Sequence, residues 1–342
     1  MTAFDLDRRS ELEAFKRLNL SLIASSFGYE IDRRKSTRHS VLMESGNDKI
    51  IVAQNGQHYV YCSVYDTASS GTVIDFAQRV IDPGCSLGRV RQLLRPFLNS
   101  GYVRKTESRC SGRFAKEIRP SETDLVGVAA RMASFVPIAP SHPYLTEQRG
   151  VPADLLTSKR LTGRVLCCPR RGSVVFPHWG RPAGGGEADR CLVGYEIKGP
   201  GVNLFSKGGR KGLWMSAGRP GDRILAFAES GLDALSYLAV RADADARAAS
   251  VSGRLNPDQP ALMLAAVRRM EEGARVVAAF DNDEAGDRLT EELAAIVVDA
   301  GRSDLSFVED RPRQRGADWN DVLKREPQRN TAGEVASPRL GR

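Results

Sequence analysis

The 342-residue sequence predicts an α/β protein whose C-terminal part holds a parallel sheet with flanking helices, preceded by small α+β domains. In the last third, short apolar runs such as residues 224–228 and 276–280 alternate with segments of helical period, residues 232–241 and 284–300. Continuous apolar strands that alternate with amphipathic helices indicate a parallel sheet covered on both faces. Upstream, shorter β-rich runs stand beside single helical segments, which is typical of small mixed domains.

The first hundred residues are predicted to form a separate α+β module. Residues 10–27 carry apolar side chains at a helical period. Two β-rich runs, residues 49–53 and 58–64, flank Gln-Asn-Gly-Gln, a sequence suited to a hairpin turn. Two more helices are predicted at residues 72–80 and 87–98, the first of them after a glycine.

Residues 101–121 are polar, basic and rich in Ser and Gly, so we predict a linker there. From Arg79 to Arg119 ten basic residues face three acidic ones, a local charge of +7. Such a run is either a solvated helix face and linker or a track for nucleic acid. Both interpretations stay open from the sequence.

Residues 122–218 are predicted to form a second α+β subdomain. It begins with a helix at 122–135, and another helix starts near Pro152, a residue suited to a first helical turn. Short strands and a glycine-rich loop follow, at residues 165–168, 173–177, 183–186 and 191–197. The parallel-sheet domain is assigned to residues 219–325, with further elements at 248–251, 257–272 and 306–308, and residues 326–342 are predicted to be a disordered tail.

Composition narrows the class of protein. The net charge of +8 and pI near 9.3 favour a polyanionic partner. No apolar run is long enough to span a bilayer, and the N-terminus lacks the pattern of a secretory signal. The six cysteines form no CxxC pair, so neither a disulfide framework nor a zinc site is expected. We therefore predict a cytoplasmic protein without membrane contact.

Acidic residues follow two of the predicted strands. Glu229 comes directly after residues 224–228, and Asp281 comes directly after residues 276–280, with Asp283 two positions later. The carboxyl ends of parallel strands meet at one edge of a sheet, where ligands bind. Carboxylates gathered there repel one another, and Mg²⁺ with its preference for oxygen ligands relieves that repulsion. The competing interpretation is a helix N-cap with solvated acids.

With these residues the sequence resembles the Toprim family, the metal-binding module of bacterial-type DNA primases, topoisomerases and some nucleases. The matching motifs are Glu229-Ser-Gly-Leu-Asp233, Phe280-Asp-Asn-Asp-Glu-Ala-Gly286 and Gly316-Ala-Asp318-Trp-Asn-Asp-Val-Leu323. The resemblance implies that Glu229 is the general acid/base and that Asp281 and Asp283 are the principal ligands of Mg²⁺ (or Mn²⁺). It makes Asp233 and Asp318 secondary acidic positions, while Asn320 stands where the primase pattern has a carboxylate.

The resemblance extends upstream to the primase core. Residues 173–177, 193–198 and 203–208 follow the order of the primase subdomain that precedes Toprim, where basic residues hold template and nucleotide. It implies phosphate contacts for four residues, whose alternative role is surface solubility: Lys198, Lys207, Arg210 and Lys211. The first hundred residues resemble the zinc-binding primase module in layout. Only Cys62 and either His39 or His58 remain of its ligand set, which implies a metal-free relic.

The resemblance is closest to Toprim proteins of plasmids and integrative elements that carry an uncharacterised domain ahead of Toprim. It implies Mg²⁺-dependent, primase-like nucleotidyl transfer on a DNA template during replication or transfer of a mobile element. The expected partners are single-stranded DNA and nucleotides, with replication or transfer proteins as further candidates. Two alternatives remain: a Toprim nuclease that cleaves DNA phosphodiesters, and a non-catalytic accessory protein that binds nucleic acid.

Overall fold

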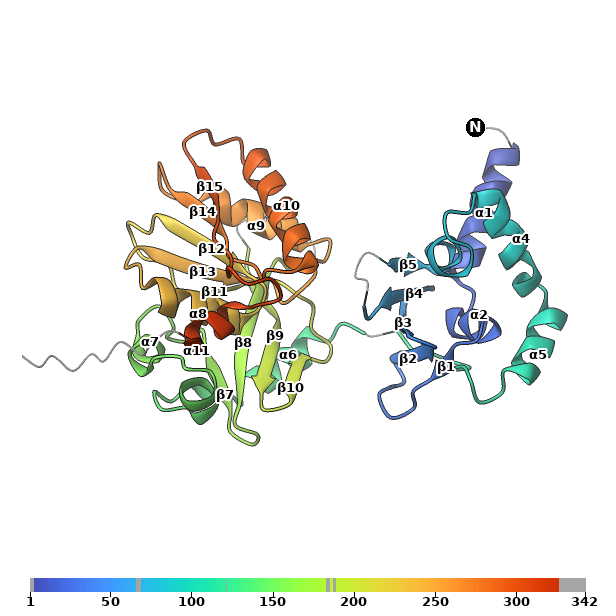
Figure 1. The fold of residues 1–342 in the computed structure, drawn as a ribbon, viewed down its shortest axis with the longest axis horizontal. Coiled ribbons are helices and arrows are strands. Elements are labelled where there is room, and N and C mark those ends of the chain that lie inside the picture. The colour runs from blue at the N-terminus through green and yellow to red at the C-terminus, as the bar shows by residue number, and fades with distance from the viewer. Residues whose placement is uncertain (1–2, 66–68, 121, 183–184, 187–188, 326–342) are drawn as a thin grey trace, which may run out of the picture. The chain divides into compact units, whose positions relative to one another are not determined.

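The computed structural model describes residues 3–65, 69–120, 122–182, 185–186 and 189–325. The chain forms two compact units, divided between Glu122 and Thr123 (Figure 1). The predicted tail at residues 326–342 lies outside the described residues.

The first unit is built on an antiparallel sheet whose strands follow one another in chain order. The strands are β1 (Glu30–Ile31), β2 (Ser40–Ser45), β3 (Asp48–Asn55), β4 (His58–Ser63) and β5 (Ser70–Thr72). Gly56, with φ of +60°, forms the tight turn between β3 and β4 and confirms the predicted hairpin. Strand side chains such as Met43 and Ile50 are fully buried against helical residues such as Phe76 and Leu94.

Five α-helices and one π-helical turn complete this unit. They are α1 (Ala3–Lys16), α2 (Leu20–Ser26), α3 (Val73–Phe76), η1 (Ala77–Ile81), α4 (Leu87–Leu98) and α5 (Ser100–Arg109). The segment predicted as one helix over residues 10–27 is divided, because the side chain of Asn19 caps α2 by accepting bonds from Ser21 N and Leu22 N. Asn19 also donates its amide to Ala115 O at 2.8 Å.

Residues 101–118, which the sequence analysis assigned to a linker, instead pack within the first unit. Residues 100–109 form helix α5. Cys110 and Phe114 then pack with Leu22, and Ile118 is buried in the main core of the unit. The segment is polar in composition, but a few apolar residues at separate positions are enough to hold it against α2.

The second unit contains two sheets of five strands each. The first sheet is antiparallel, in the order β10 (Val202–Phe205), β9 (Cys191–Gly199), β8 (Ser173–Gly180), β7 (Leu166–Cys168), β6 (Val136–Pro137). The second has the order β11 (Trp214–Met215), β13 (Ala246–Ser250), β12 (Ile224–Ala228), β14 (Arg275–Ala278), β15 (Ser306–Glu309). The helical elements are α6 (Leu125–Met132), η2 (Tyr144–Gln148), α7 (Ala153–Thr157), α8 (Gly231–Arg241), α9 (Gln259–Arg268), α10 (Glu284–Asp299) and α11 (Trp319–Arg325).

The second sheet confirms the predicted parallel arrangement. Strands β12, β13, β14 and β15 run parallel, and only the edge strand β11 is antiparallel. Successive side chains of β12 enter different cores: Ile224 and Ala226 face the core with α8 and α11, whereas Leu225 and Phe227 face the core with α9 and α10. Because both faces are covered, the strand is apolar at every position.

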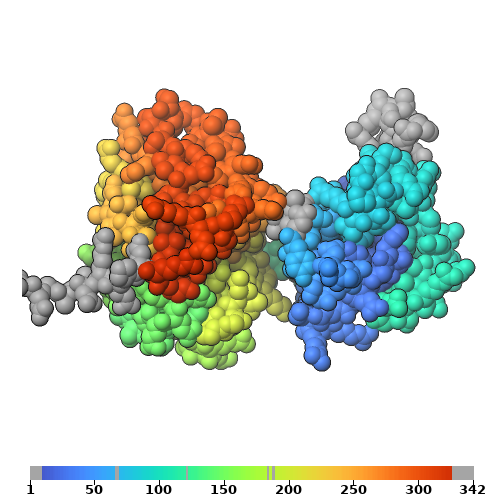
Figure 2. Space-filling view, in the orientation of Figure 1, coloured from blue at the N-terminus to red at the C-terminus, as the bar shows by residue number. Residues whose placement is uncertain are grey.

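The two sheets of this unit share a core and meet at the N-terminus of α8. Figure 2 shows the green-to-yellow and orange-to-red segments as one continuous surface. Phe176 of β8 lies so close to Gly231 that a Cβ atom there would approach its ring to 2.4 Å. Glu196 of β9 accepts the backbone N–H of Gly231 at 2.9 Å. The antiparallel sheet therefore supplies a cap for the helix that follows β12.

Candidate active site

Four acidic side chains line one cavity of about 370 Å³ at the carboxyl edge of the parallel sheet. They are Glu229, Asp233, Asp281 and Asp318. Glu229 follows β12, and Asp281 follows β14, as predicted. Asp233 lies in the first turn of α8, and Asp318 directly precedes α11. The fold thus gathers carboxylates that lie far apart in the chain.

Asp283 does not line this cavity, but its charge acts on the acids that do. Its carboxylate is the N-cap of α10 and accepts the N–H of Gly286 at 2.8 Å. Asp318 likewise accepts the N–H of Asp321 at 2.6 Å. Asp283 therefore does cap a helix, as the competing interpretation of the sequence predicted. This cap does not exclude a second role, because one capping bond occupies one of two carboxylate oxygens.

The acids of the cavity resist ionisation. Loss of hydration, followed by the charges of Asp233 and Glu229, raises the pKa of Asp281 to about 9. Burial also raises the pKa of Asp233 to about 7, although Ser230 Oγ donates to its carboxylate at 2.5 Å. The pKa of Glu229 is raised by burial and then by Asp283. Such clustering of raised carboxyl pKa values is typical of functional sites.

The donor chemistry fits a hard divalent cation that keeps part of its water shell. Asp281 Oδ1 is buried and has no hydrogen-bond partner, so one oxygen in the cavity lacks a compensating charge or donor. Among the described residues, no three His, Cys, Asp or Glu side chains are grouped closely enough to hold a metal by themselves. The carboxylate oxygens of the cavity suit Mg²⁺, which binds through one or two carboxylates, water and substrate oxygens.

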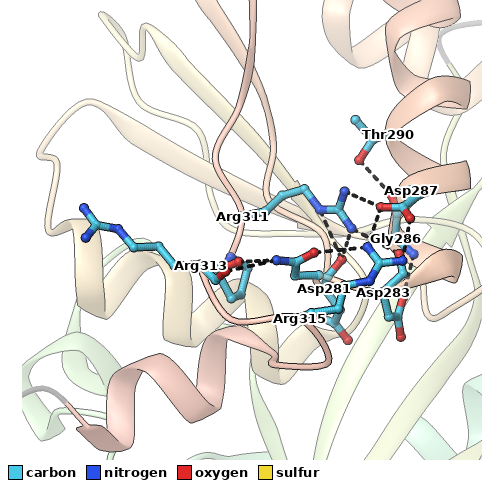
Figure 3. A network of polar contacts seen from close by, with 10 residues as sticks. Asp281, Asp283, Gly286, Asp287, Thr290, Arg311, Arg313 and Arg315 are labelled. Atoms are coloured by element: carbon cyan, nitrogen blue, oxygen red, sulfur yellow. Dashed lines mark hydrogen bonds and ion pairs between the residues drawn. The ribbon is translucent and has the colours of Figure 1, made fainter.

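A network of arginines holds the turn that carries Asp281 and Asp283 (Figure 3). Arg311 donates Nε to the backbone oxygen of Asp281 at 3.1 Å and Nη1 to Asp287 Oδ1 at 2.6 Å. Arg315 forms a second ion pair with Asp287 at 2.8 Å. Hydrogen bonds from Arg315 and Arg311 lower the pKa of Asp287 to about 2. These residues were not predicted, and the only signal for them is the basic run at residues 311–315.

Asn320, which replaces a carboxylate of the primase pattern, has a packing role. Its side chain is fully buried, and its amide donates to Arg149 O at 2.7 Å and to Ser236 Oγ at 3.1 Å. Its carbonyl oxygen accepts Arg149 Nη1 at 3.2 Å. Arg149 lies over the ring of Tyr144, 5.1 Å from its centre, and both residues line the acidic cavity. Sequence reasoning did not identify Arg149 as part of the site.

The four basic residues singled out from the sequence divide into two pairs. Lys198 lines the cavity and forms an ion pair with Glu196 at 3.0 Å. Lys211 is partly buried near Glu229; burial lowers its pKa, while Glu196 and Glu229 oppose that shift. Arg210 is instead paired with Asp258 at 2.5 Å, and Lys207 is exposed and does not line the cavity.

The three residues considered as remaining zinc ligands lie at separate places in the first unit. His39 Nδ1 contacts Arg119 O at 3.0 Å, His58 lies 3.1 Å from a carboxylate oxygen of Glu13, and Cys62 is exposed on β4. They form no metal-ligand group within the described part of the chain.

Comparison with known families identifies the kind of domain that carries these acids. Residues 226–323 match the family described as Toprim-like, so this part of the second unit is a Toprim-like domain. Among solved structures, the primase fragment of the bacteriophage T7 primase-helicase protein is similar, with 14% identity and a TM-score of 0.32. That similarity covers 51% of this chain and 66% of the phage chain, just under two thirds. No curated protein matches the chain, and no helix among the described residues is long and apolar enough to cross a membrane.

Proposed function

We propose that this protein carries out Mg²⁺-dependent, primase-like nucleotidyl transfer on single-stranded DNA. The observation that carries the proposal is the cavity in which Glu229, Asp233, Asp281 and Asp318 of the Toprim-like domain meet Lys198 of β9. The four acids can bind a cation, and the lysine beside them can bind a phosphate. The net charge of +8 supports a polyanionic partner. Replication or transfer of a mobile element in the cytoplasm is the setting we propose.

We assign a role to each residue of the site, Asp283 acting through the carboxylate oxygen that does not cap α10. Asp281 and Asp283 would hold the cation, and Asp233 and Asp318 would add negative charge beside it. Bound Mg²⁺ polarises a phosphoryl oxygen and offsets the charge that develops during transfer. Glu229 would accept the proton of the attacking hydroxyl, because its raised pKa makes it a better base than a solvated carboxylate. Lys198 would contact the phosphate, with Glu196 orienting its ammonium group.

Synthesis of short oligonucleotides on a single-stranded template, with nucleotides and Mg²⁺ or Mn²⁺, tests the proposal. Replacing both principal ligands, Asp281→Asn with Asp283→Asn, should lower synthesis by about 100-fold or more. Glu291→Gln is the matched control, because Glu291 is an exposed acid on α10, the helix that Asp283 caps. Synthesis that survives the double substitution would refute the site.

The same preparation distinguishes the alternative chemistries. Nicking of supercoiled plasmid that depends on Asp281 and Asp283, without incorporation of nucleotides, would assign a nuclease. Salt-sensitive DNA binding without calorimetric binding of Mg²⁺ would assign a non-catalytic accessory protein.

A further inference from the structure

A second, larger cavity lies in the same unit, away from the acids. It has a volume of about 660 Å³, within the range of small-molecule sites. Four arginines and one indole line it together with mostly uncharged side chains, and none of the lining residues that the structure describes is acidic. The charged and aromatic members are Arg164, Trp179, Arg190, Arg247 and Arg269.

This cavity lies beside the edge strand β11 and the helix α9, and the acids lie elsewhere in the unit. Arg247 is the second residue of β13, at the amino end of a parallel strand, whereas Glu229 follows the carboxyl end of its neighbour β12. In β8, Trp179 lies near the end of the strand, while its first residue, Ser173, is close to Gly199, which lines the acidic cavity. The two cavities share no lining residue.

Arg247 is a half-buried cation without a carboxylate partner among the described residues. Its Nε atom is buried and makes no hydrogen bond, and its Nη2 atom meets only the sulfur of Met215, at 3.6 Å. The nearby carboxylate of Asp222 is already bound by Arg160 at 2.6 and 3.0 Å. Burial lowers the pKa of Arg247; the charge of Asp222 opposes that shift, and Arg164 adds to it. An unpaired, poorly hydrated guanidinium inside a cavity is a preformed anion site.

Trp179 provides the second element of recognition, an accessible aromatic surface. Trp179 is 38% exposed, whereas Trp214 and Trp319 are almost completely buried. Backbone hydrogen bonds between Trp179 and Leu213, both of 2.9 Å, fix the position of the indole beside β11. Leu262 and Ala266, one turn apart on α9, add apolar surface to the cavity.

We propose that this cavity binds a nucleotide, with the base stacked on Trp179 and the phosphate held by Arg247, Arg164 and Arg269. Base stacking on an aromatic ring and phosphate binding by arginine are separate chemistries, and a nucleotide offers a group for each of them. A free nucleotide and the 5′-phosphorylated end of a strand present the same two groups. This site does not depend on metal at the acidic cavity and is independent of the function proposed above.

Fluorescence titration in EDTA tests the proposal, because Trp179 is the one exposed tryptophan among the three and EDTA removes any metal-dependent binding at the acids. ATP, GTP and a 5′-phosphorylated oligonucleotide should each be tried with the wild type and with Asp281→Asn, Asp283→Asn. We expect bound ligand to quench the fluorescence of Trp179. The substitutions Asp281→Asn and Asp283→Asn should leave that quenching unchanged. Arg269→Ala and Arg247→Met should each weaken binding by about tenfold or more.

Arg268→Ala is the matched control, since the Arg268 guanidinium donates to Asp299 O instead of lining the cavity. It removes the same charge at the next position and should leave binding unchanged. Trp179→Phe should abolish the quenching, with calorimetry measuring the affinity that remains. Binding of ATP or GTP identifies a free nucleotide, and binding of the oligonucleotide alone identifies a strand end. Absence of binding by all three, equal loss with Arg268→Ala, or equal competition by inorganic phosphate would overturn the proposal.

Discussion

At the residue scale, the clustered carboxyl groups of the site destabilise the fold when no metal is bound. Asp281 has a buried, unpartnered oxygen and a pKa raised to about 9 by burial and neighbouring acids. Residues that serve a ligand commonly lower the stability of the fold that carries them. The first prediction follows from this conflict.

Asp281→Asn should stabilise the metal-free protein, by about 1 to 3 kcal/mol at pH 8, because the carboxyl must take up a proton on folding and an amide need not. Thermal melts in EDTA measure the effect. Adding Mg²⁺ should raise the melting temperature of the wild type more than that of the variant, since only the wild type keeps the ligand. A variant with a lower melting temperature than the wild type in EDTA would contradict this account. So would a variant whose melting temperature rises as much as that of the wild type when Mg²⁺ is added.

His178 offers a test of pH dependence outside the acidic site. The residue is fully buried, and its Nδ1 lies 2.8 Å from Gly212 O, so the neutral ring donates there. Burial lowers its pKa from 6.5, with Lys211 adding to that shift and Glu196 opposing it. The unfolded chain therefore takes up a proton at a higher pH than the folded one. The stability that His178 contributes is complete above pH 6.5 and is lost as the pH falls below it.

Denaturant unfolding between pH 7 and pH 5 measures this loss. For His178 the slope should approach about 1.4 kcal/mol per pH unit at most, the value for one proton. His178→Asn keeps a donor for Gly212 O but cannot titrate, so its unfolding free energy should fall less steeply. Identical slopes in the two proteins would show that His178 is protonated in the fold.

At the scale of elements, the turn from β14 into α10 sets the position of both principal acids. The backbone is so compact there that a Cβ on Gly286 would lie 1.9 Å from Asp281 O and 2.8 Å from the Arg311 guanidinium. Thr290 also donates to Gly286 O at 2.7 Å. The turn therefore tolerates no side chain at this position.

Gly286→Ala should destabilise the second unit by about 3 kcal/mol or more, because the turn must open and Arg311 must move. Gly88→Ala in α4 is the matched control: its nearest neighbour is Ser86 Oγ at an ordinary 3.6 Å. It should be neutral or stabilising by about 0.5 to 1 kcal/mol. Calorimetry on both variants tests the contrast, and similar effects at the two glycines would disprove it.

At the scale of the whole molecule, the chain divides into two units with separate hydrophobic cores. The clusters around Phe76 and Leu22 contain only residues of the first unit. The clusters around Trp214, Phe227 and Val175 contain only residues of the second. Units with separate cores can unfold independently.

We expect two transitions in a calorimetric scan, with cleavage by a glutamate-specific protease in the native state concentrated after Glu122, at the boundary between the units. Mg²⁺ should shift only the transition of the second unit, because all the candidate ligands belong to it. A single cooperative transition that responds as a whole to Mg²⁺ would show that the units stabilise each other.

Local patterns predicted a large part of the second unit. The apolar run at residues 224–228 is β12, and the run at 276–280 overlaps β14, which ends two residues earlier at Ala278; Glu229 and Asp281 do follow parallel strands at one edge. The helix at residues 87–98 was also predicted with its observed bounds. These features depend on side-chain periodicity and strand direction, which neighbouring residues specify.

Contacts between distant segments were not predicted. The packing of Phe114 against Leu22, the bond from Arg311 to the turn at Asp281, and the burial of Asn320 each join residues far apart in the chain. Their sequence signals are single polar or apolar residues, which have many possible partners. The cavity around Arg247 likewise draws its arginines from several separate segments.

The sequence by itself determined the alternation of strands and helices in the second unit, and with it the edge at which Glu229, Asp281 and Asp283 lie. Tertiary structure alone decided which acids share a cavity, and that Lys198 joins the site while Arg210 does not. The physical reason is range: periodicity acts over a few residues, whereas burial, ion pairing and cavity shape depend on segments that only the folded chain brings together.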